Sequence, residues 1–104
     1  MYIKGSKGID WLSIYLPMIN YLDSNAQKIG LVIGADDIYY FKNIEKYVFI
    51  DSQKMTLYIS DNSSFTNNIF ILNSSNLNLE NMKSGILNIE RVEKLKNLFN
   101  VSEF

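Results

Sequence analysis

The fold is decided by residues 46–60, KYVFIDSQKMTLYIS. Two apolar stretches flank a polar turn from Ser52 to Lys54, and this arrangement is typical of a β-hairpin. Every other residue of the second stretch is apolar, so these side chains share one face of the strand: Met55, Leu57 and Ile59. The sequence therefore predicts an antiparallel pair of strands at the centre of the fold.

Further strands are predicted on both sides of this hairpin. Residues 28–34 alternate between large and small side chains, and residues 38–41 are Ile, Tyr, Tyr and Phe, which favour a pleated surface. Residues 69–72 form a short, continuous apolar stretch of the kind found in buried strands. An alternative interpretation makes residues 36–48 a helix capped by Asp36; we prefer the strand.

The segment from Ile9 to Leu22 predicts an N-terminal helix with Asp10 as its cap. Pro17 lies inside the pattern, so the helix should kink there, or a second helix should begin there. Apolar residues surround most of its circumference, which is more than one small core needs. We therefore expect a homodimer, with an interface that contains Trp11, Tyr15, Met18 and Tyr21.

Near the other end of the chain, Asn88 is the expected cap of a C-terminal helix in which acidic residues precede basic ones, as the helix dipole favours. Residues 73–85 predict an irregular connection with a helical turn near Glu80. The helix has an apolar stripe that we expect to be buried, formed by Ile89, Val92, Leu95 and Phe99.

A chain of 104 residues is long enough for one domain, residues 1–104. The predicted fold class is α+β. It comprises a kinked N-terminal helix, an antiparallel meander of four or five short strands, and a C-terminal helix packed on one face. The segment 38–60 together with the last helix looks like small bacterial domains of the pleckstrin-homology type. The N-terminal helix does not fit that pattern, and we carry no function over.

The composition excludes several classes of function. The chain has no Cys and no His, so it cannot form a disulfide, a zinc finger or a histidine-based catalytic triad. Ten basic and eleven acidic residues give a net charge of −1, so we expect no binding to duplex nucleic acid. No apolar stretch is long enough to cross a membrane. Polar residues interrupt the segment 9–22 too often for a signal peptide, so we expect a cytoplasmic location.

Asp36 and Asp37 are the sharpest candidates for chemistry. They belong to the stretch IGADDI, residues 33–38. Ala-Asp-Asp between hydrophobic strands resembles the catalytic hairpin of reverse-transcriptase-like palm domains, and the resemblance implies a Mg²⁺ site. We expect instead an exposed structural turn, because Asp is favoured in turns, and we expect no metal, cofactor or catalytic residue.

Aromatic residues make up 13% of the chain, and ordinary cross-strand packing is one explanation of them. Four tyrosines alternate along the predicted strands, so some must lie on the face opposite the core: Tyr39, Tyr40, Tyr47 and Tyr58. Exposed aromatic side chains are typical anchors of binding surfaces. We expect either Tyr39 with Tyr47, or Tyr40 with Tyr58, on a broad exposed patch.

The sequence thus predicts a small non-enzymatic interaction protein, an inhibitor or accessory subunit that binds another protein or its own copies. Small size and a composition rich in Asn, Ile and Lys are typical of proteins that phages and other mobile elements encode. The alternative is a small-molecule binder that sequesters a nucleotide-like ligand between aromatic rings and Lys side chains. The third hypothesis is a divalent-metal enzyme that uses Asp36 and Asp37.

Overall fold

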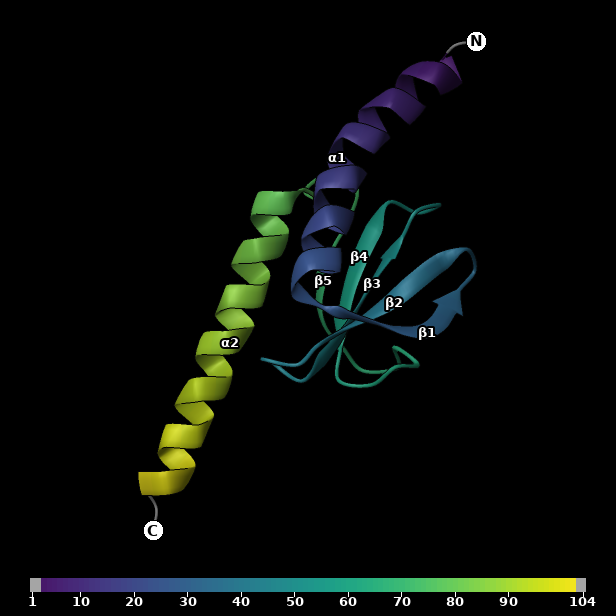
Figure 1. Cartoon of the computed structure of the whole chain (residues 1–104). Helices are drawn as coiled ribbons and strands as arrows, with labels where there is room; N and C mark the ends of the chain where they lie inside the picture. Colours follow the sequence, from purple (N-terminus) through teal and green to yellow (C-terminus); the bar gives the residue numbers. More distant parts are fainter. Residues whose placement is uncertain (1–2, 103–104) are drawn as a thin grey trace.

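The chain folds into one antiparallel sheet and two long helices (Figure 1). The computed structural model describes the backbone of residues 3–102 and the side chains of residues 11–96. Along the chain the elements are α1 (Ile3–Asn25), β1 (Gln27–Ile33), β2 (Asp36–Phe41), β3 (Lys46–Asp51), β4 (Thr56–Ser60), β5 (Asn68–Leu72) and α2 (Leu79–Ser102). Each strand pairs with the next, so the sheet is a meander in the order β1-β2-β3-β4-β5. The predicted α+β fold is confirmed.

The central hairpin has the register that its apolar pattern indicates. Val48 of β3 lies opposite Ile59 of β4, and Ile50 lies opposite Leu57. All four side chains are buried. Residues 36–41 form a strand and not a helix, because Tyr39 pairs with Val48 in the neighbouring strand. The preference for the strand is confirmed.

The turn before β2 is shorter than the sequence analysis predicts. Gly34 and Ala35 alone connect β1 to β2, and Ile33 pairs with Asp36. Gly34 has a φ of +62°, which glycine adopts without steric cost and which suits a two-residue hairpin turn. Asp36 is therefore the first residue of a strand. It is buried, with 8% of its surface exposed, and the expectation of an exposed turn residue is wrong.

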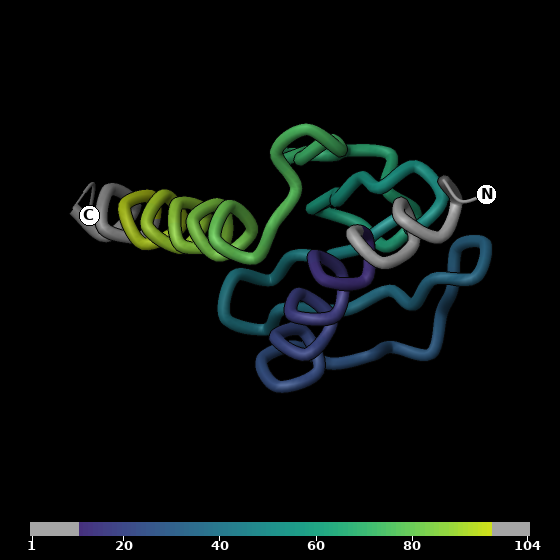
Figure 2. The backbone as a smooth tube through the Cα atoms, turned by 90° about the horizontal axis from the view of Figure 1, so that it is seen from above, coloured from purple at the N-terminus to yellow at the C-terminus, as the bar shows by residue number. Residues whose placement is uncertain are grey.

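α1 is one continuous helix that contains Pro17. It begins at Ile3, before the expected cap at Asp10, and no second helix begins at the proline. The helix lies across one face of the sheet (Figures 1 and 2). Met18 and Leu22 on its inner side are fully buried in the core, because they face the apolar residues of the strands.

α2 begins earlier than expected, and its cap is Asn78 rather than Asn88. The backbone N–H of Asn81 donates to Oδ1 of Asn78 at 2.7 Å, which satisfies one of the free N–H groups of the first turn. The first turns bury Met82 and Ile86 in the same core as α1.

The second half of α2 extends beyond the sheet (Figures 1 and 2). Val92 and Leu95 belong to the stripe that we expected to be buried, yet 50% and 53% of their surfaces are exposed. The side chain of Phe99 lies outside the described residues. No helix in the described part of the chain is long and apolar enough to cross a membrane.

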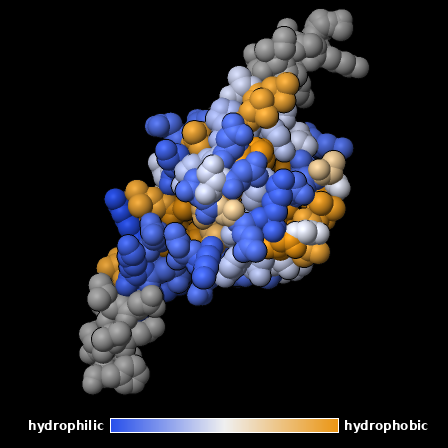
Figure 3. Space-filling view, in the orientation of Figure 1, coloured by the Kyte–Doolittle hydropathy of each residue, from blue (hydrophilic) through white to orange (hydrophobic). Residues whose placement is uncertain are grey.

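Both helices lie on the same face of the sheet, and one cluster of apolar side chains from α1, α2 and the strands fills the space between them. On this helix-covered side the exposed apolar residues form separate patches, over α1, along α2 and at the β1–β2 hairpin (Figure 3). The opposite face of the sheet is left without a covering helix in the described part of the chain.

Candidate functional site

The uncovered face of the sheet carries a set of mainly aromatic side chains, which we call the aromatic face. Strand alternation and pairing place its members on the side away from the helices, and the loop after β4 adds one more ring: Ile38, Tyr40, Tyr47, Phe49, Tyr58, Ile71 and Phe65. None of them belongs to the core cluster beneath α1 and α2.

The centre of the aromatic face is packed. Phe49 is only 4% exposed, because the ring of Tyr58 stacks beside it with 6.0 Å between ring centroids and 13° between ring planes. The ring of Phe65 covers it from another side at 5.5 Å. Tyr40 and Tyr47 lie opposite each other on β2 and β3, with their ring centroids 4.9 Å apart. These contacts give the surface a defined shape without a helix on it.

The loop between β4 and β5 holds Phe65 in place. Phe65 has a φ of +57°, a left-handed conformation that bulky residues rarely adopt. Its backbone N–H donates to the carbonyl of Asn62 at 3.2 Å, and the side-chain Oδ1 of Asn62 accepts from the N–H of Thr66 at 3.1 Å. These hydrogen bonds stabilise the strained turn that brings the Phe65 ring onto Phe49.

The strand positions of the aromatic face carry no Lys or Arg in β2 to β5. The two carboxylates at its edge are engaged within the chain. Oδ2 of Asp36 accepts from the N–H and the hydroxyl of Ser52, both at 3.0 Å. Oδ1 of Asp51 accepts from the N–H groups of Gln53 and Lys54 at 3.0 and 3.1 Å. The face therefore offers rings and hydroxyl groups rather than charges.

Of the four tyrosines expected at a binding surface, three share the aromatic face and one does not. Tyr40, Tyr47 and Tyr58 are half-buried, and within residues 11–96 no hydrogen bond engages their hydroxyl groups. Tyr39 lies in the core with 2% of its surface exposed. The expectation of Tyr39 on an exposed patch is wrong, because the register with Val48 turns its ring toward α1.

The hydroxyl of Tyr39 donates to Oδ1 of Asp23 at the end of α1, at 2.9 Å. Burial raises the pKa of Tyr39 strongly, and the hydrogen bond and negative charge of Asp23 raise it further. Burial and the charges of Asp36 and Asp37 also raise the pKa of Tyr15. Both tyrosines therefore lie between α1 and β2: Tyr39 reaches from β2 to Asp23 of α1, and Tyr15 of α1 lies near Asp36 and Asp37 of β2.

The four residues expected at a dimer interface pack against the core of their own chain. Met18 is fully buried, and the other three are half-buried against the core cluster: Trp11, Tyr15 and Tyr21. The exposed apolar residues of α1 are instead Leu12 and Leu16, each 49% exposed. Self-association stays a prediction, and through α1 it would use these leucines.

Asp36 and Asp37 both lie near Tyr15, but each carboxylate is engaged within the chain. Asp36 accepts hydrogen bonds from Ser52, and Oδ2 of Asp37 lies 3.7 Å from the ammonium group of Lys28. Within the described residues no three potential metal ligands of the Asp, Glu, His and Cys types come together. The geometry gives no support to the resemblance with the palm-domain hairpin.

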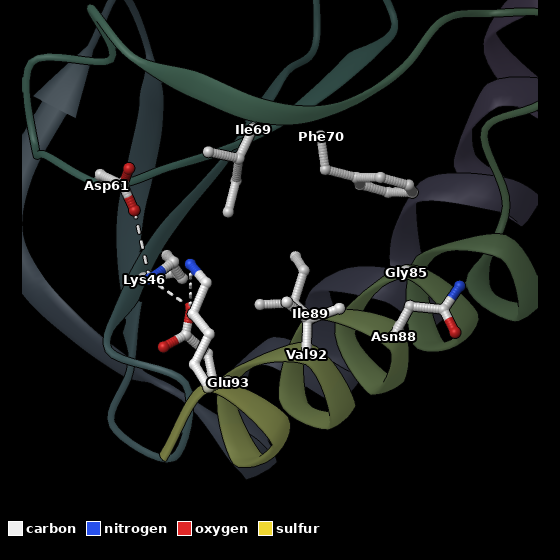
Figure 4. Close-up of a pocket in the computed structure, with 10 residues that line it drawn as sticks. Lys46, Asp61, Ile69, Phe70, Gly85, Asn88, Ile89, Val92 and Glu93 are labelled. Atoms are coloured by element: carbon white, nitrogen blue, oxygen red, sulfur yellow. Dashed lines mark ion pairs between the residues drawn. The ribbon is translucent and has the colours of Figure 1, made fainter. Parts of the chain in front are cut away.

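A cleft of about 370 Å³ lies on the other side of the sheet, between β5 and α2 (Figure 4). Its walls are apolar: Ile69 and Phe70 point into it from β5, and Ile89 and Val92 point into it from α2. Gly85 forms part of the α2 wall, and a Cβ atom there would overlap the ring of Phe70. The absence of a side chain thus allows Phe70 to lie against the helix backbone.

One end of the cleft is polar. The ammonium group of Lys46, whose side chain is 12% exposed, lies 3.1 Å from Oδ1 of Asp61 and 3.6 Å from Oε2 of Glu93. Burial lowers the pKa of Lys46, but the hydrogen bonds and charges of the two carboxylates outweigh it, so the pKa is raised. Lys46 is therefore charged at neutral pH and ties α2 to the sheet.

Sequence reasoning missed the cleft and part of the aromatic face. The stretch 69–72 reads as a buried strand, whereas Ile69 and Ile71 are 42% and 53% exposed. β5 is an edge strand, and an uninterrupted apolar stretch does not distinguish an edge strand from a central one. An aromatic residue within a polar loop, Phe65, is a sequence feature that indicates a special role. The contact of Phe65 with Phe49 could not be predicted, because it depends on the conformation of the turn.

No protein-family model, curated protein or solved structure matches this chain.

Proposed function

We propose that the chain is a small non-enzymatic interaction protein that binds another protein through its aromatic face. The observation that carries this proposal is the presence of Tyr40, Tyr47 and Tyr58 on a sheet face that no described helix covers. They are half-buried, and no hydrogen bond within residues 11–96 engages their hydroxyl groups. Tyrosine offers a large, rigid apolar area and a polar tip, and it is a common anchor of protein interfaces.

The chemistry of the face favours a protein partner over a nucleic acid. Single-stranded nucleic acids stack on aromatic rings but also need a cationic groove along their backbone. The aromatic face has no Lys or Arg at its strand positions. Protein interfaces, in contrast, are depleted of charge at their centre and enriched in aromatic residues.

The nucleotide-binding alternative needs rings that line a concave site. The β5–α2 cleft contains no tyrosine. Two smaller clefts beside α1 and α2 contain Tyr21 but none of the tyrosines of the aromatic face. The aromatic face itself is a surface of stacked rings, which suits a broad partner better than a single small ligand.

The packed centre of the face supports the same proposal. Phe49 is held by Tyr58 and Phe65 before any partner arrives, so binding requires little ordering of side chains. We propose an inhibitor or accessory subunit as the biological role, because the chain is small and has no His or Cys, and we propose the cytoplasm as its location.

The test compares partner capture by matched variants. Tagged wild-type protein, Tyr58→Ala and Tyr21→Ala are incubated with a lysate of the cells that make the protein, and bound proteins are identified by mass spectrometry. We expect one protein to be retained by the wild type and by Tyr21→Ala, whose substitution lies on the helix side. Tyr58→Ala should weaken its binding by about 2 kcal/mol, or about thirtyfold in Kd, if Tyr58 is an anchor.

A thermal-shift screen with nucleotides tests the alternative. A rise of several degrees that disappears in Tyr58→Ala would replace the proposed function with small-ligand binding. Equal capture by wild type and Tyr58→Ala would remove the aromatic face from the proposal.

A further inference from the structure

We propose that the cleft between β5 and α2 binds an extended, apolar segment of a partner protein, which pairs with β5 as an additional strand of the sheet. This site lies on the opposite side of the sheet from Tyr40, Tyr47 and Tyr58. The proposal therefore stands or falls independently of the function of the aromatic face.

β5 is an open edge of the sheet. It is the last strand in the sheet order and, among residues 3–102, pairs only with β4. The free backbone groups of an edge strand are a template for a further strand. Charged residues and prolines usually protect such edges, but the sequence of β5, residues 68–72, is NIFIL and contains neither.

The other edge of the sheet is protected in the way that β5 is not. β1 carries Lys28, and its pairing with β2 shifts between Lys28 and Val32. Gly30 lies within this irregular stretch with a φ of +82°. Edge lysines oppose strand addition. The pairing of β5 with β4 is also irregular, between Ile59 and Ser60, but β5 carries no charged residue. This difference in charge directs a partner strand to β5.

The cleft provides a place for side chains of the added strand. Alternate side chains of a strand point to opposite faces, so every second residue of the partner segment would enter the space between β5 and α2. That space has about 370 Å³ and is walled by Ile69, Phe70, Ile89 and Val92 (Figure 4). Ile69 and Val92 remain 42% and 50% exposed, so an apolar residue placed between them removes apolar surface from water on both walls.

The polar end of the cleft explains why the segment should be uncharged. Two ammonium groups and two carboxylates balance each other there. Lys46 lies between Asp61 and Glu93, and the ammonium group of Lys96 is 3.8 Å from Oε2 of Glu93. No excess charge attracts a phosphate or a charged peptide. A small molecule or a helix could fill the apolar space, but only an extended chain can also pair with the backbone of β5.

The ion pairs also keep the cleft in shape. Glu93 comes from the part of α2 that begins to leave the sheet, and Lys46 comes from β3. Their contact ties α2 to the sheet, so the α2 wall of the cleft is in place before the partner segment binds. Preformed sites lose less conformational entropy on binding.

The experiment uses a phage-displayed library of short random peptides selected on the immobilised full chain. Enriched peptides are resynthesised with a fluorescent label, and their Kd is measured by fluorescence anisotropy. We expect the enriched peptides to share bulky apolar residues at alternate positions. N-methylation of the backbone amides on one edge of the peptide should abolish binding, because it removes donors to β5.

Two pairs of matched variants locate the site. Ile69→Lys and Ile71→Lys alter exposed positions two residues apart in β5. Ile69 lies at the irregularity in the pairing of β5 with β4, and of these two residues only Ile69 lines the cleft. Val92→Lys and Leu95→Lys alter exposed positions one turn apart on α2, but only Val92 lines the cleft. We expect Ile69→Lys and Val92→Lys to weaken peptide binding at least about tenfold, and Ile71→Lys and Leu95→Lys to change it less than about twofold.

Circular dichroism melts establish that each variant is folded, and Val92→Lys keeps the test decisive if Ile69→Lys does not fold. The proposal is overturned if no peptide is enriched, if both variants of a pair weaken binding equally, or if N-methylation has no effect. Tyr58→Ala should leave peptide binding unchanged. Loss of peptide binding in Tyr58→Ala would place the peptide on the aromatic face and would also overturn the cleft proposal.

Discussion

Tyr39 and Tyr40 are neighbours in β2, yet they belong to opposite sides of the sheet. The ring of Tyr39 is buried beneath α1, and its hydroxyl donates to Asp23. The ring of Tyr40 packs on Tyr47 across the strands, on the side without a helix. The same residue type thus completes the core on one face and forms an open surface on the other. The difference arises from strand alternation alone, because adjacent side chains must point apart.

The two faces also differ in what holds them together. The helix-covered face is closed by aliphatic side chains such as Leu57 and Ile59, which are fully buried. The aromatic face is closed by rings that shield one another, and its outermost residues remain partly in contact with water. Substitutions on the first face should therefore affect mainly stability, and those on the second mainly binding.

The largest expected effect is that of Leu57→Ala on the helix-covered face. The side chain is fully buried between the sheet and the helices, so truncation removes apolar contacts and leaves a cavity. We expect the free energy of unfolding, measured by urea denaturation, to fall by about 3 kcal/mol. Ile71→Ala, at a 53% exposed position of the other face, should change it by about 0.5 kcal/mol. Similar losses in both variants would contradict the distinction between the faces.

A smaller effect is expected when the carboxylate of Asp36 is removed. Asp36→Ala takes away the acceptor of two hydrogen bonds from Ser52 and should lower the free energy of unfolding by about 2 kcal/mol. Asp37→Ala, at the adjacent exposed position, should cost about 0.5 kcal/mol or less. Thermal melts of both variants measure the difference. Equal melting temperatures of the two variants would show that Asp36 does not stabilise the turn after β3.

The pH dependence of stability should identify the buried tyrosine. The pKa of Tyr39 is raised in the folded chain, so above pH 10 the unfolded chain loses this proton first, and stability falls as pH rises. The contribution of Tyr39 is fully present below pH 10 and decreases by about 1.4 kcal/mol per pH unit above it. Tyr39→Phe lacks this contribution. The stability advantage of the wild type over Tyr39→Phe should therefore shrink between pH 10 and 11, and an advantage that stays constant would exclude burial of the neutral hydroxyl.

The smallest effect on stability is expected for Tyr58→Phe. The substitution keeps the stack on Phe49 and removes a hydroxyl that no described hydrogen bond engages. Denaturant unfolding should show a change of about 0.5 kcal/mol or less. A loss of 2 kcal/mol would mean that the hydroxyl is needed for folding rather than left for a partner.

Much of the fold follows from the sequence because it is local. The alternation in residues 46–60 fixes the central hairpin and its register, and the α+β architecture follows from it and the two helical patterns. The choice of face for each tyrosine does not follow, because alternation fixes only that Tyr39 and Tyr40 differ. Contacts between distant elements decide which of them meets the helices.

The same reason limits what the sequence shows of the helices. Trp11 and Tyr15 look like surplus apolar surface in the sequence, but both are partly buried against the core of their own chain, and self-association stays a prediction. Val92 and Leu95 look like core residues, but α2 extends beyond the sheet before it reaches them. Periodicity identifies an apolar side of a helix, whereas only the packing shows how much of it the sheet covers.

We propose that the aromatic face is open in the free chain and covered by a protein partner in the complex. Nitration of tyrosines followed by mass spectrometry tests it on the free protein and on the captured complex. We predict that Tyr40, Tyr47 and Tyr58 react in the free chain while Tyr39 does not, and that the partner protects these three but not Tyr21. Equal nitration of the three tyrosines with and without the partner, or protection confined to Tyr21, would show that the partner does not cover the aromatic face.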